Sequence, residues 1–390
     1  MKTARLADLC SLVTDGTHYT PADIGSGIPF LTVTNMTPAG LDFANCSRIS
    51  AEDFAAARAG NSAPQSGDVL FSKDGTVGKV CVVDTSEEFA VLSSIAILRP
   101  RDKVDSNYLG QMLRTPEVLA QATSLKSGSA VRRIILSALK QVEIPLPALE
   151  EQRRVAAILD HADALRDNRR QALANLDALT QAIFHDMFGD PARWDRMWPM
   201  GRIVDLASSI AYGTSAKAGS AGEWPVLRMG NVTDDGRIDL TDLKYIDLSA
   251  VDIPKYTIRR GDLLFNRTNS KEKVGKTAVV HTDAPLALAG YLVRVRFKPG
   301  NEADFVSAYL GSPHGVRVRQ RLAKAAVNQA NISASVMREI PIAMPPASVQ
   351  SSFAERLRRL REQRDFAVRA DSEVQRLFAS LQSRAFSGDL

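Results

Sequence analysis

The chain has 390 residues, of which 45% are hydrophobic and 24% are charged, and it carries a formal net charge of +5. This length allows two or three domains with a core each, and the mild basicity permits a polyanionic partner without requiring one. The three cysteines, Cys10, Cys46 and Cys81, lie far apart without a C-x-x-C spacing, which argues against a disulfide framework and a zinc site and fits a reducing compartment.

The first ten residues, MKTARLADLC, mix charged and apolar side chains and so lack the continuous hydrophobic region of a secretion signal. The longest uncharged apolar stretch, 284–293, is about half as long as a bilayer span requires. We therefore expect a cytoplasmic protein that does not cross a membrane.

The second half of the chain repeats the first. RLADLCSLVTDGT at Arg5 matches RIVDLASSIAYGT at Arg202, and GDVLFSKDGTVGKVCVV at Gly67 matches GDLLFNRTNSKEKVGKTAVV at Gly261. Further on, VEIPLP matches REIPIA. The repeated unit spans roughly two hundred residues, which is too long for a solenoid repeat and indicates two similar domains.

Each copy contains short strand-like runs, such as DVLF, KVCVV and SIAIL, separated by glycine, proline, asparagine and aspartate. Short helices are expected near 106–123 and 302–325. Each copy then continues into a long segment of helical periodicity that begins just after prolines, which fit the first turn of a helix and would break its interior.

The first long segment has the alternating spacing of three and four that is typical of a coiled-coil seam. The predicted seam comprises Val155, Ile158, Ala162, Leu165, Arg169, Ala172, Leu176, Leu179 and Ile183. Either the neighbouring globular part or the other long helix covers it, and we favour antiparallel pairing of the two helices. From Val155 to Met187 the helix would extend roughly 50 Å, enough for a rigid spacer.

The predicted fold class is mixed α/β (α+β), with two similar globular domains in a pseudo-two-fold arrangement, separated by an antiparallel coiled coil of two long helices. The predicted boundaries are 1–147 for the first domain, 148–190 for the first helix, 191–345 for the second domain with a linker at 191–201, and 346–390 for the second helix.

Twin domains on a spacer suit duplex DNA, because half-sites on one face recur about every 34 Å. The framework of the copies is kept while the polar residues between its elements differ, so the two domains would recognise different half-sites. Arginine and lysine can bind guanine edges or phosphates, and asparagine can bind adenine; solvated turns are the alternative for each residue. The predicted DNA contacts are Lys73, Lys79, Arg132, Arg133, Thr214, Lys217, Arg267, Asn269, Lys276, Asn328 and Gln329.

The stretch IPLPALEEQRRVAAIL, the MFGDP that ends the first long helix and the duplication together resemble the DNA-specificity subunit of type I restriction-modification systems, over nearly the whole chain. The second copy departs from this motif, because Val349 replaces Glu151 and Ser351 replaces Arg153. This departure puts an equal role of the two helix starts in doubt.

The resemblance implies two target-recognition domains and helices that dock the methyltransferase subunits, of which we expect two. It implies S-adenosylmethionine, ATP and Mg on partner subunits, motor and endonuclease subunits as further partners, and no cofactor or catalysis on this chain. The helix residues assigned to partner binding are Glu151, Gln152, Arg154, Arg166, Arg170, Arg356 and Arg359. An ordinary solvated helix exterior is the alternative for each of them.

A search for catalytic and metal-binding chemistry leaves no candidate. VGKT at Val274 lacks the leading glycine of a phosphate-binding loop, since that position is Ser270, and no helix is expected after it. Asp242 and Lys244 match only the tail of a nuclease motif. Two other functions remain open: a recognition fragment of a single-chain restriction-modification enzyme, and a coiled-coil scaffold that binds proteins.

Overall fold

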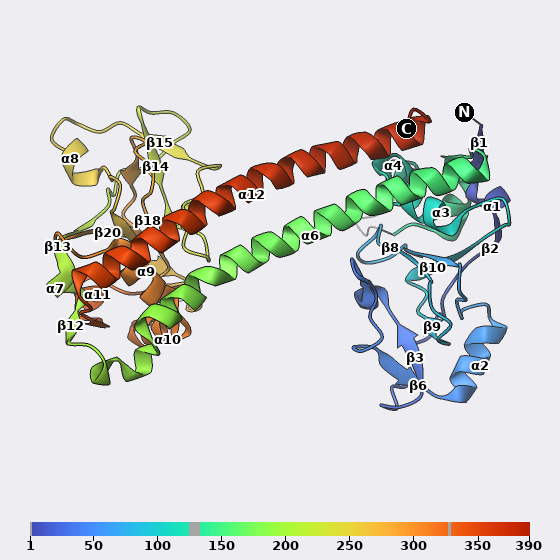
Figure 1. Cartoon of the computed structure of the whole chain (residues 1–390), viewed down its shortest axis with the longest axis horizontal. Coiled ribbons are helices and arrows are strands. Elements are labelled where there is room, and N and C mark those ends of the chain that lie inside the picture. The colour runs from blue at the N-terminus through green and yellow to red at the C-terminus, as the bar shows by residue number, and fades with distance from the viewer. Residues whose placement is uncertain (1, 125–132, 327–328) are drawn as a thin grey trace. The chain divides into compact units, whose positions relative to one another are not determined.

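The computed structural model describes residues 2–124, 133–326 and 329–390 (Figure 1). The chain divides into two compact units. Unit 1 comprises Met1–Arg169 and Ala370–Leu390, and unit 2 comprises Arg170–Arg369. Each unit therefore contains one globular part and a segment of each of the two long helices, α6 (Leu149–Phe188) and α12 (Ala347–Ser387).

The globular part of unit 1 is built mainly from antiparallel strands. Its strands are β1 (Thr3–Arg5), β2 (Cys10–Asp15), β3 (Ile28–Leu31), β4 (Met36–Thr37), β5 (Gly40–Leu41), β6 (Ser47–Ile49), β7 (Val69–Ser72), β8 (Val80–Val82), β9 (Ala90–Val91), β10 (Ile95–Pro100) and β11 (Glu143–Pro145). Its helices are α1 (Leu6–Leu9), η1 (Val33–Asn35), α2 (Ala51–Ala59), α3 (Ser106–Leu113), α4 (Pro116–Ser124) and α5 (Leu136–Gln141).

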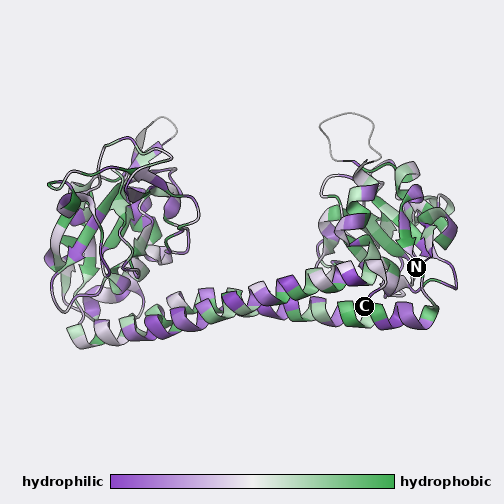
Figure 2. Cartoon of the chain, turned by 90° about the horizontal axis from the view of Figure 1, so that it is seen from above, coloured by the Kyte–Doolittle hydropathy of each residue, from purple (hydrophilic) through white to green (hydrophobic). Residues whose placement is uncertain are grey.

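The central sheet of unit 1 has the order β2-β10-β7-β8, and all its pairs are antiparallel. One core packs α1, α3, α4 and α5 together with the long helices beside this sheet, and a second core lies between it and the β6-β3-β9 sheet. Most strands of both units carry the hydrophobic colour in Figure 2, as expected for strands whose burial forms the core.

Unit 2 has a similar but not identical order of elements. Its strands are β12 (Met200–Arg202), β13 (Ala207–Tyr212), β14 (Trp224–Leu227), β15 (Lys244–Ile246), β16 (Leu263–Asn266), β17 (Thr268–Asn269), β18 (Thr277–Val279), β19 (Ala287–Leu288), β20 (Leu292–Phe297), β21 (Lys324–Ala326), β22 (Gln329–Asn331) and β23 (Pro341–Ala343). Its helices are η2 (Pro191–Arg196), α7 (Ile203–Leu206), η3 (Met229–Asn231), α8 (Ile253–Tyr256), α9 (Ala303–Gly311), α10 (Pro313–Leu322) and α11 (Ala334–Arg338).

The central sheet of unit 2, in the order β13-β20-β16-β18, repeats the unit 1 sheet strand for strand, and β15-β14-β19 repeats β6-β3-β9. A further sheet, β17-β22-β21, joins the segment after β16 to the segment before α11. The duplication read from the sequence is therefore a duplication of topology. The predicted mixed fold class is confirmed.

Two matched glycines allow a close approach of two strand ends. A Cβ on Gly16 would lie 2.0 Å from the carbonyl oxygen of Val91, and one on Gly213 would lie 2.3 Å from that of Ala289. No side chain fits in that space, so the glycine of the DGT and YGT motifs is required by packing.

The apolar residues of the long helices are covered in both of the ways considered from the sequence, by the neighbouring globular part and by the other long helix. In unit 1, Val155, Leu159 and Ala162 of α6 belong to the core of the globular part, together with Phe378 of α12. In unit 2, Phe184 of α6 and Phe353 of α12 belong to one core with the globular part, and their ring centroids lie 6.0 Å apart. Each segment therefore packs on its own globular part and also on the other helix.

The helices are antiparallel within each unit. In unit 1, Arg154 donates a hydrogen bond to the carbonyl of Leu390, and Arg166 donates one to the side chain of Gln375. Residue numbers therefore increase along α6 while they decrease along the C-terminal segment that contains α12. The strict seam was wrong along its middle part: Leu165 and Leu179 are 44% and 42% exposed, and Arg169 and Ala172 are exposed as well. These apolar side chains stay exposed because the globular cores take up only part of each helix.

Candidate nucleic-acid interface

The two polar clusters predicted separately from the sequence come together in both units. In unit 1, the N–H of Ile134 donates to the carbonyl of Lys73 at 2.7 Å, and the Arg133 guanidinium lies 3.5 Å from the Asp74 carboxylate. The segment after β7 is thus tied to the segment that precedes α5. Residues some sixty positions apart therefore form one polar surface in unit 1.

Unit 2 builds the same junction with strand pairing. The N–H of Ile332 donates to the carbonyl of Arg267 at 2.9 Å. Thr268 pairs with Asn331 across β17 and β22, and the Asn331 amide donates to the Thr268 hydroxyl at 2.7 Å. We call the junction of these two segments, with the adjoining end of β13, the loop junction of unit 2.

Lys73 does not present its charge at this surface, contrary to the prediction. Its side chain is 2% exposed, and its Nζ lies 3.0 Å from Oδ2 of Asp15, at the end of β2. A buried ammonium is stable only beside an opposite charge, so this lysine is held by the neighbouring strand.

The matched lysines Lys79 and Lys276 hold neighbouring loops, and their predicted contact with DNA stays a prediction. The Nζ of Lys79 donates to the carbonyls of Val33 and Met36 at 2.9 and 2.8 Å. The Nζ of Lys276, whose side chain is 12% exposed, lies 3.1 Å from Oδ1 of Asp234. A hydrogen bond from Lys276 is the main reason that the pKa of Asp234 is lowered. These ammonium groups already have partners inside the unit.

Thr214 is also part of the framework rather than of a surface. It is 7% exposed, as is its counterpart Thr17. The N–H of Thr214 donates to the carbonyl of Leu288 at 2.7 Å, and that of Thr17 donates to Val91 at 2.9 Å. The threonine of the repeated GT motif thus joins two strand ends, and its prediction as a DNA contact was wrong.

The remaining predicted contacts are accessible in different degrees. Arg133, Lys217 and Gln329 are exposed, whereas Arg267 and Asn269 are half-buried. The other two, Arg132 and Asn328, lie outside the described residues. The structure brings Arg267, Asn269 and Gln329 together on the paired strand ends of unit 2.

Exposed tyrosines accompany these polar residues, and the sequence reasoning missed them. Tyr212 ends β13 and Tyr291 precedes β20, and the two are 43% and 55% exposed. In unit 1, Tyr19 is 50% exposed. Aromatic rings beside arginine and amide groups are suited to stacking and hydrogen bonding with a nucleic acid. The available signal was that Tyr212 aligns with a charged residue, Asp15.

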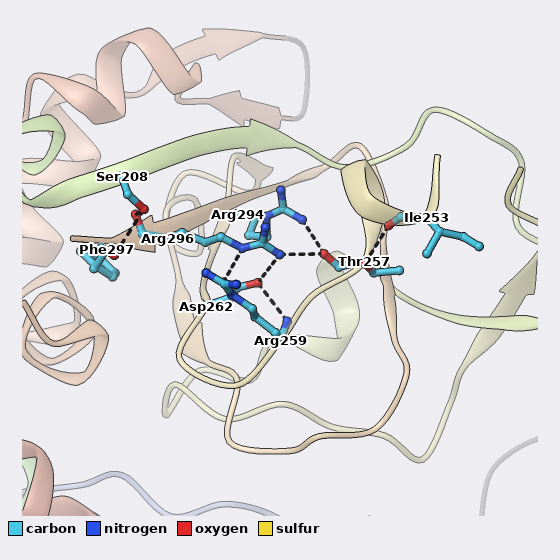
Figure 3. Close-up of polar contacts among 8 residues, drawn as sticks. All are labelled: Ser208, Ile253, Thr257, Arg259, Asp262, Arg294, Arg296 and Phe297. Atoms are coloured by element: carbon cyan, nitrogen blue, oxygen red, sulfur yellow. Dashed lines mark hydrogen bonds and ion pairs between the residues drawn. The ribbon is translucent and has the colours of Figure 1, made fainter. Parts of the chain in front are cut away.

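A buried carboxylate organises the centre of each unit. In unit 1, Arg99 donates through Nε and a terminal nitrogen to Asp68, both at 2.8 Å. In unit 2, Arg296 donates through Nε to Asp262 at 3.0 Å (Figure 3). Both aspartates also accept a backbone N–H three positions earlier, that of Gln65 in unit 1. The GD of the repeated GD-x-LF motif therefore closes a turn and neutralises an arginine of the next strand.

Unit 2 adds a second arginine beside this pair. Arg294 is 5% exposed and donates to the carbonyl of Thr257, which Arg296 also approaches (Figure 3). Burial, and next the nearby Arg296 charge, lower the pKa of Arg294. The matched position in unit 1 is Ile97, a core residue.

Gln152 fastens the start of α6, and its prediction as a partner-binding residue was wrong. Its side chain is 1% exposed; it accepts the N–H of Asp105 at 2.9 Å and donates to the carbonyls of Lys103 and Pro147. Gln350 repeats this at the start of α12, accepting the N–H of Glu302 at 3.0 Å. The repeated glutamine thus connects each long helix to its own globular part.

The other residues predicted to bind partners lie on the helix exteriors, with one exception. Arg154 lies 2.7 Å from Glu151, and this hydrogen bond is the main cause of the lowered pKa of Glu151. Arg166 is the exception, because its guanidinium carbon lies 4.1 Å from the ring centroid of Phe378, between the helices of unit 1. The exposed ones are Arg154, Arg170, Arg356 and Arg359, with Glu151 half-buried.

Within the described ranges, no group of three His, Cys, Asp or Glu side chains is placed to hold a metal ion. Over the same residues, no helix combines the length and apolar character of a bilayer span.

Comparison with known proteins points to one family. The profile described as "Type I restriction modification DNA specificity domain" matches residues 1–177. The specificity subunit of the type I restriction enzyme EcoKI from Escherichia coli K12 is 22% identical over 314 residues, covering 75% of this chain and 68% of that protein. The StySPI specificity subunit from Salmonella potsdam is also 22% identical, over 320 residues, covering 75% of this chain and 67% of that protein.

Two solved structures share the fold. A chain from a structure of the assembly and conformational transition of the type I R-M system is 18% identical, with a TM-score of 0.57, over 100% of this chain and 98% of that one. The S subunit of a type I restriction-modification system from M. genitalium is 14% identical, with a TM-score of 0.57, over 99% of this chain and 96% of that one.

Proposed function

The chain belongs to the specificity subunits of type I restriction-modification systems, and on that premise we propose that each of its two units recognises one part of a bipartite duplex DNA target. In this proposal the chain itself performs no catalysis. S-adenosylmethionine, ATP and Mg bind to the subunits with which the chain assembles.

One observation carries the division of the target between the units. The two units repeat their sheet topology, their buried Asp–Arg pairs and their glutamine anchors, while the residues at the strand ends and loop junctions differ. Two domains that bind different DNA sequences require a shared framework with different surface residues. A scaffold that bound the same protein twice would instead keep its surface residues alike.

The long helices supply the second part of the proposal. Their exposed faces carry arginines and glutamates. Arg359 pairs with Glu355 of its own helix, and Arg356 lies 3.8 Å from Asp186 of the other helix while its side chain stays exposed. We infer that these faces dock two methyltransferase subunits and that motor and endonuclease subunits join that complex. Exposed ion pairs contribute little to the stability of a helix, so such residues are available to a partner.

A domain exchange tests the proposal. Residues 5–147 are replaced by the equivalent domain of a relative that methylates a different sequence, and the host methylome is sequenced with the modification subunits present. We expect one half of the methylated motif to change and the other half to stay. An unchanged motif, or a change in both halves, would contradict the division of the target between the units.

A further inference from the structure

The two units place different residue pairs at one position of the fold. Asp15 at the end of β2 pairs in register with Ala96 of β10, and Tyr212 at the end of β13 pairs with Val293 of β20. The residue after β7 is Lys73, and the residue after β16 is Arg267. The pair Asp15–Lys73 of unit 1 is therefore replaced by Tyr212–Arg267 in unit 2.

The unit 1 pair neutralises itself. The carboxylate of Asp15 lies 3.0 Å from the ammonium of Lys73, whose side chain is buried. His18 contacts the same carboxylate at 3.3 Å and is exposed. A ligand would have to break a buried ion pair before it could bind Lys73, so this lysine is unsuited to recognition.

The unit 2 pair leaves the positive charge unpaired. The guanidinium carbon of Arg267 lies 4.9 Å from the ring centroid of Tyr212, a side chain without a carboxylate. Among the ion pairs of the described residues none involves Arg267, and its Nε is buried without a hydrogen-bond partner. A ligand that binds this guanidinium therefore does not first have to break an ion pair of the described residues.

The backbone of the same arginine is held on both sides. Its backbone N–H donates to the carbonyl of Tyr291 at 3.0 Å, and its backbone carbonyl accepts the N–H of Ile332 at 2.9 Å. The hydroxyl of Tyr212 accepts the N–H of Ala334 at 3.0 Å, which fixes the ring beneath the guanidinium. The planar guanidinium thus lies against a fixed aromatic ring before any ligand binds, which lowers the entropic cost of binding.

We propose that Arg267 recognises a guanine in the part of the target bound by unit 2, with Tyr212 orienting its guanidinium, and that unit 1 has no counterpart because Asp15 neutralises Lys73. This inference rests on the proposed function. Guanine presents two acceptors, O6 and N7, in the major groove, and the guanidinium fork matches both. The nearby Asn269 and Gln329 provide amide groups at the same loop junction.

The test compares the full wild-type chain with two variants, R267K and the double variant Y212D/R267K, which installs the unit 1 pair in unit 2. A duplex is selected by the wild-type chain with its modification subunits from a random-sequence pool, and each base pair is then substituted in turn. We expect the wild type to bind about tenfold to a hundredfold more weakly when one particular guanine is replaced. Both variants should lose that difference and keep their preferences at all other positions.

The double variant D15N/K73M is the matched control, because it removes both charges of the unit 1 pair and should leave every base preference in place. Unchanged tryptophan fluorescence and thiol reactivity show that the variants are folded. If the R267K variant weakens binding to all duplexes equally and lowers the salt dependence, Arg267 contacts a phosphate and the proposal is overturned. If the wild type selects no sequence, the proposed function itself fails.

Discussion

The Nε of Arg296 lies 3.0 Å from Oδ1 of Asp262. This buried carboxylate lies close to two further arginines, Arg294 and Arg259 (Figure 3). In unit 1, Asp68 pairs with Arg99, and Ile97 stands at the position that matches Arg294. Unit 2 therefore concentrates more positive charge on a single acid. The same framework pair has different electrostatic surroundings in the two halves.

This difference predicts that D262N destabilises unit 2 more than D68N destabilises unit 1. Removing the charge leaves the half-buried Arg296 without its ion-pair partner and the buried Arg294 without a nearby negative charge, which costs about 3 kcal/mol or more. All three tryptophans lie in unit 2 and all three cysteines lie in unit 1. Urea unfolding followed by tryptophan fluorescence thus reports on unit 2, and thiol labelling reports on unit 1.

The double variant D262N/R294I serves as the control for this comparison, because Ile97 shows that the framework accepts isoleucine there. It should recover part of the lost free energy of unfolding. Equal losses for D68N and D262N, with no recovery in the double variant, would show that Arg294 does not depend on Asp262.

The repeated glutamines predict a second pair of unit-specific effects. Q152A leaves the N–H of Asp105 and the carbonyls of Lys103 and Pro147 without their partner, so unit 1 should lose about 2–3 kcal/mol of stability. Q350A should act in the same direction on unit 2. The measurement is again thiol labelling against tryptophan fluorescence in urea.

The exposed residue Gln171, which bonds to Asn175 one turn later, provides the control for the glutamine prediction. Q171A should change the unfolding free energy by less than about 0.5 kcal/mol. A loss as large as that of Q152A would mean that the helix itself, and not its anchor to the globular part, sets the stability.

Unit 1 should lose stability at alkaline pH. Burial raises the pKa of the Cys10 thiol to about 12, and it also raises the pKa values of Cys81 and Tyr108. A raised pKa means that the unfolded chain gives up its proton first, so this stability is complete below about pH 9 and falls as the pH rises toward 12. The slope is about 1.4 kcal/mol per pH unit for each fully titrating group.

Chemical denaturation between pH 8 and pH 11 checks the alkaline prediction. Unfolding is monitored by circular dichroism, because thiol labelling itself depends on pH. C10A should flatten the decline for unit 1. A decline of the same steepness in wild type and C10A would exclude Cys10 as a cause.

The spacer hypothesis predicts that the length of the helices sets the gap between the two parts of the target. Seven residues inserted after Arg169 and seven after Arg369 should lengthen each helix by roughly 10 Å, which corresponds to about three base pairs. Methylome sequencing should then show the same two half-sites with a wider gap. An insertion in one helix only is the control and should impair assembly; an unaltered gap would refute the spacer role.

Local patterns in the sequence were enough to find the helices and the duplication. The predicted first helix, 148–190, contains α6 at Leu149–Phe188, because apolar periodicity and prolines at the entry act over a few turns of one segment. The repeated GD, GT and IP motifs likewise marked turns and strand ends that both units keep. These features depend on backbone geometry close along the chain, so one sequence determines them.

Only the tertiary structure decided which polar residues are available to a ligand. Lys73 and Arg267 occupy matched positions and looked equivalent, yet the first is buried against Asp15 and the second lies on Tyr212. Whether a charge is exposed depends on the partner that a strand distant in sequence brings to it. Gln152 was mistaken for a surface residue for the same reason, since its partners at Lys103 and Asp105 lie far back along the chain.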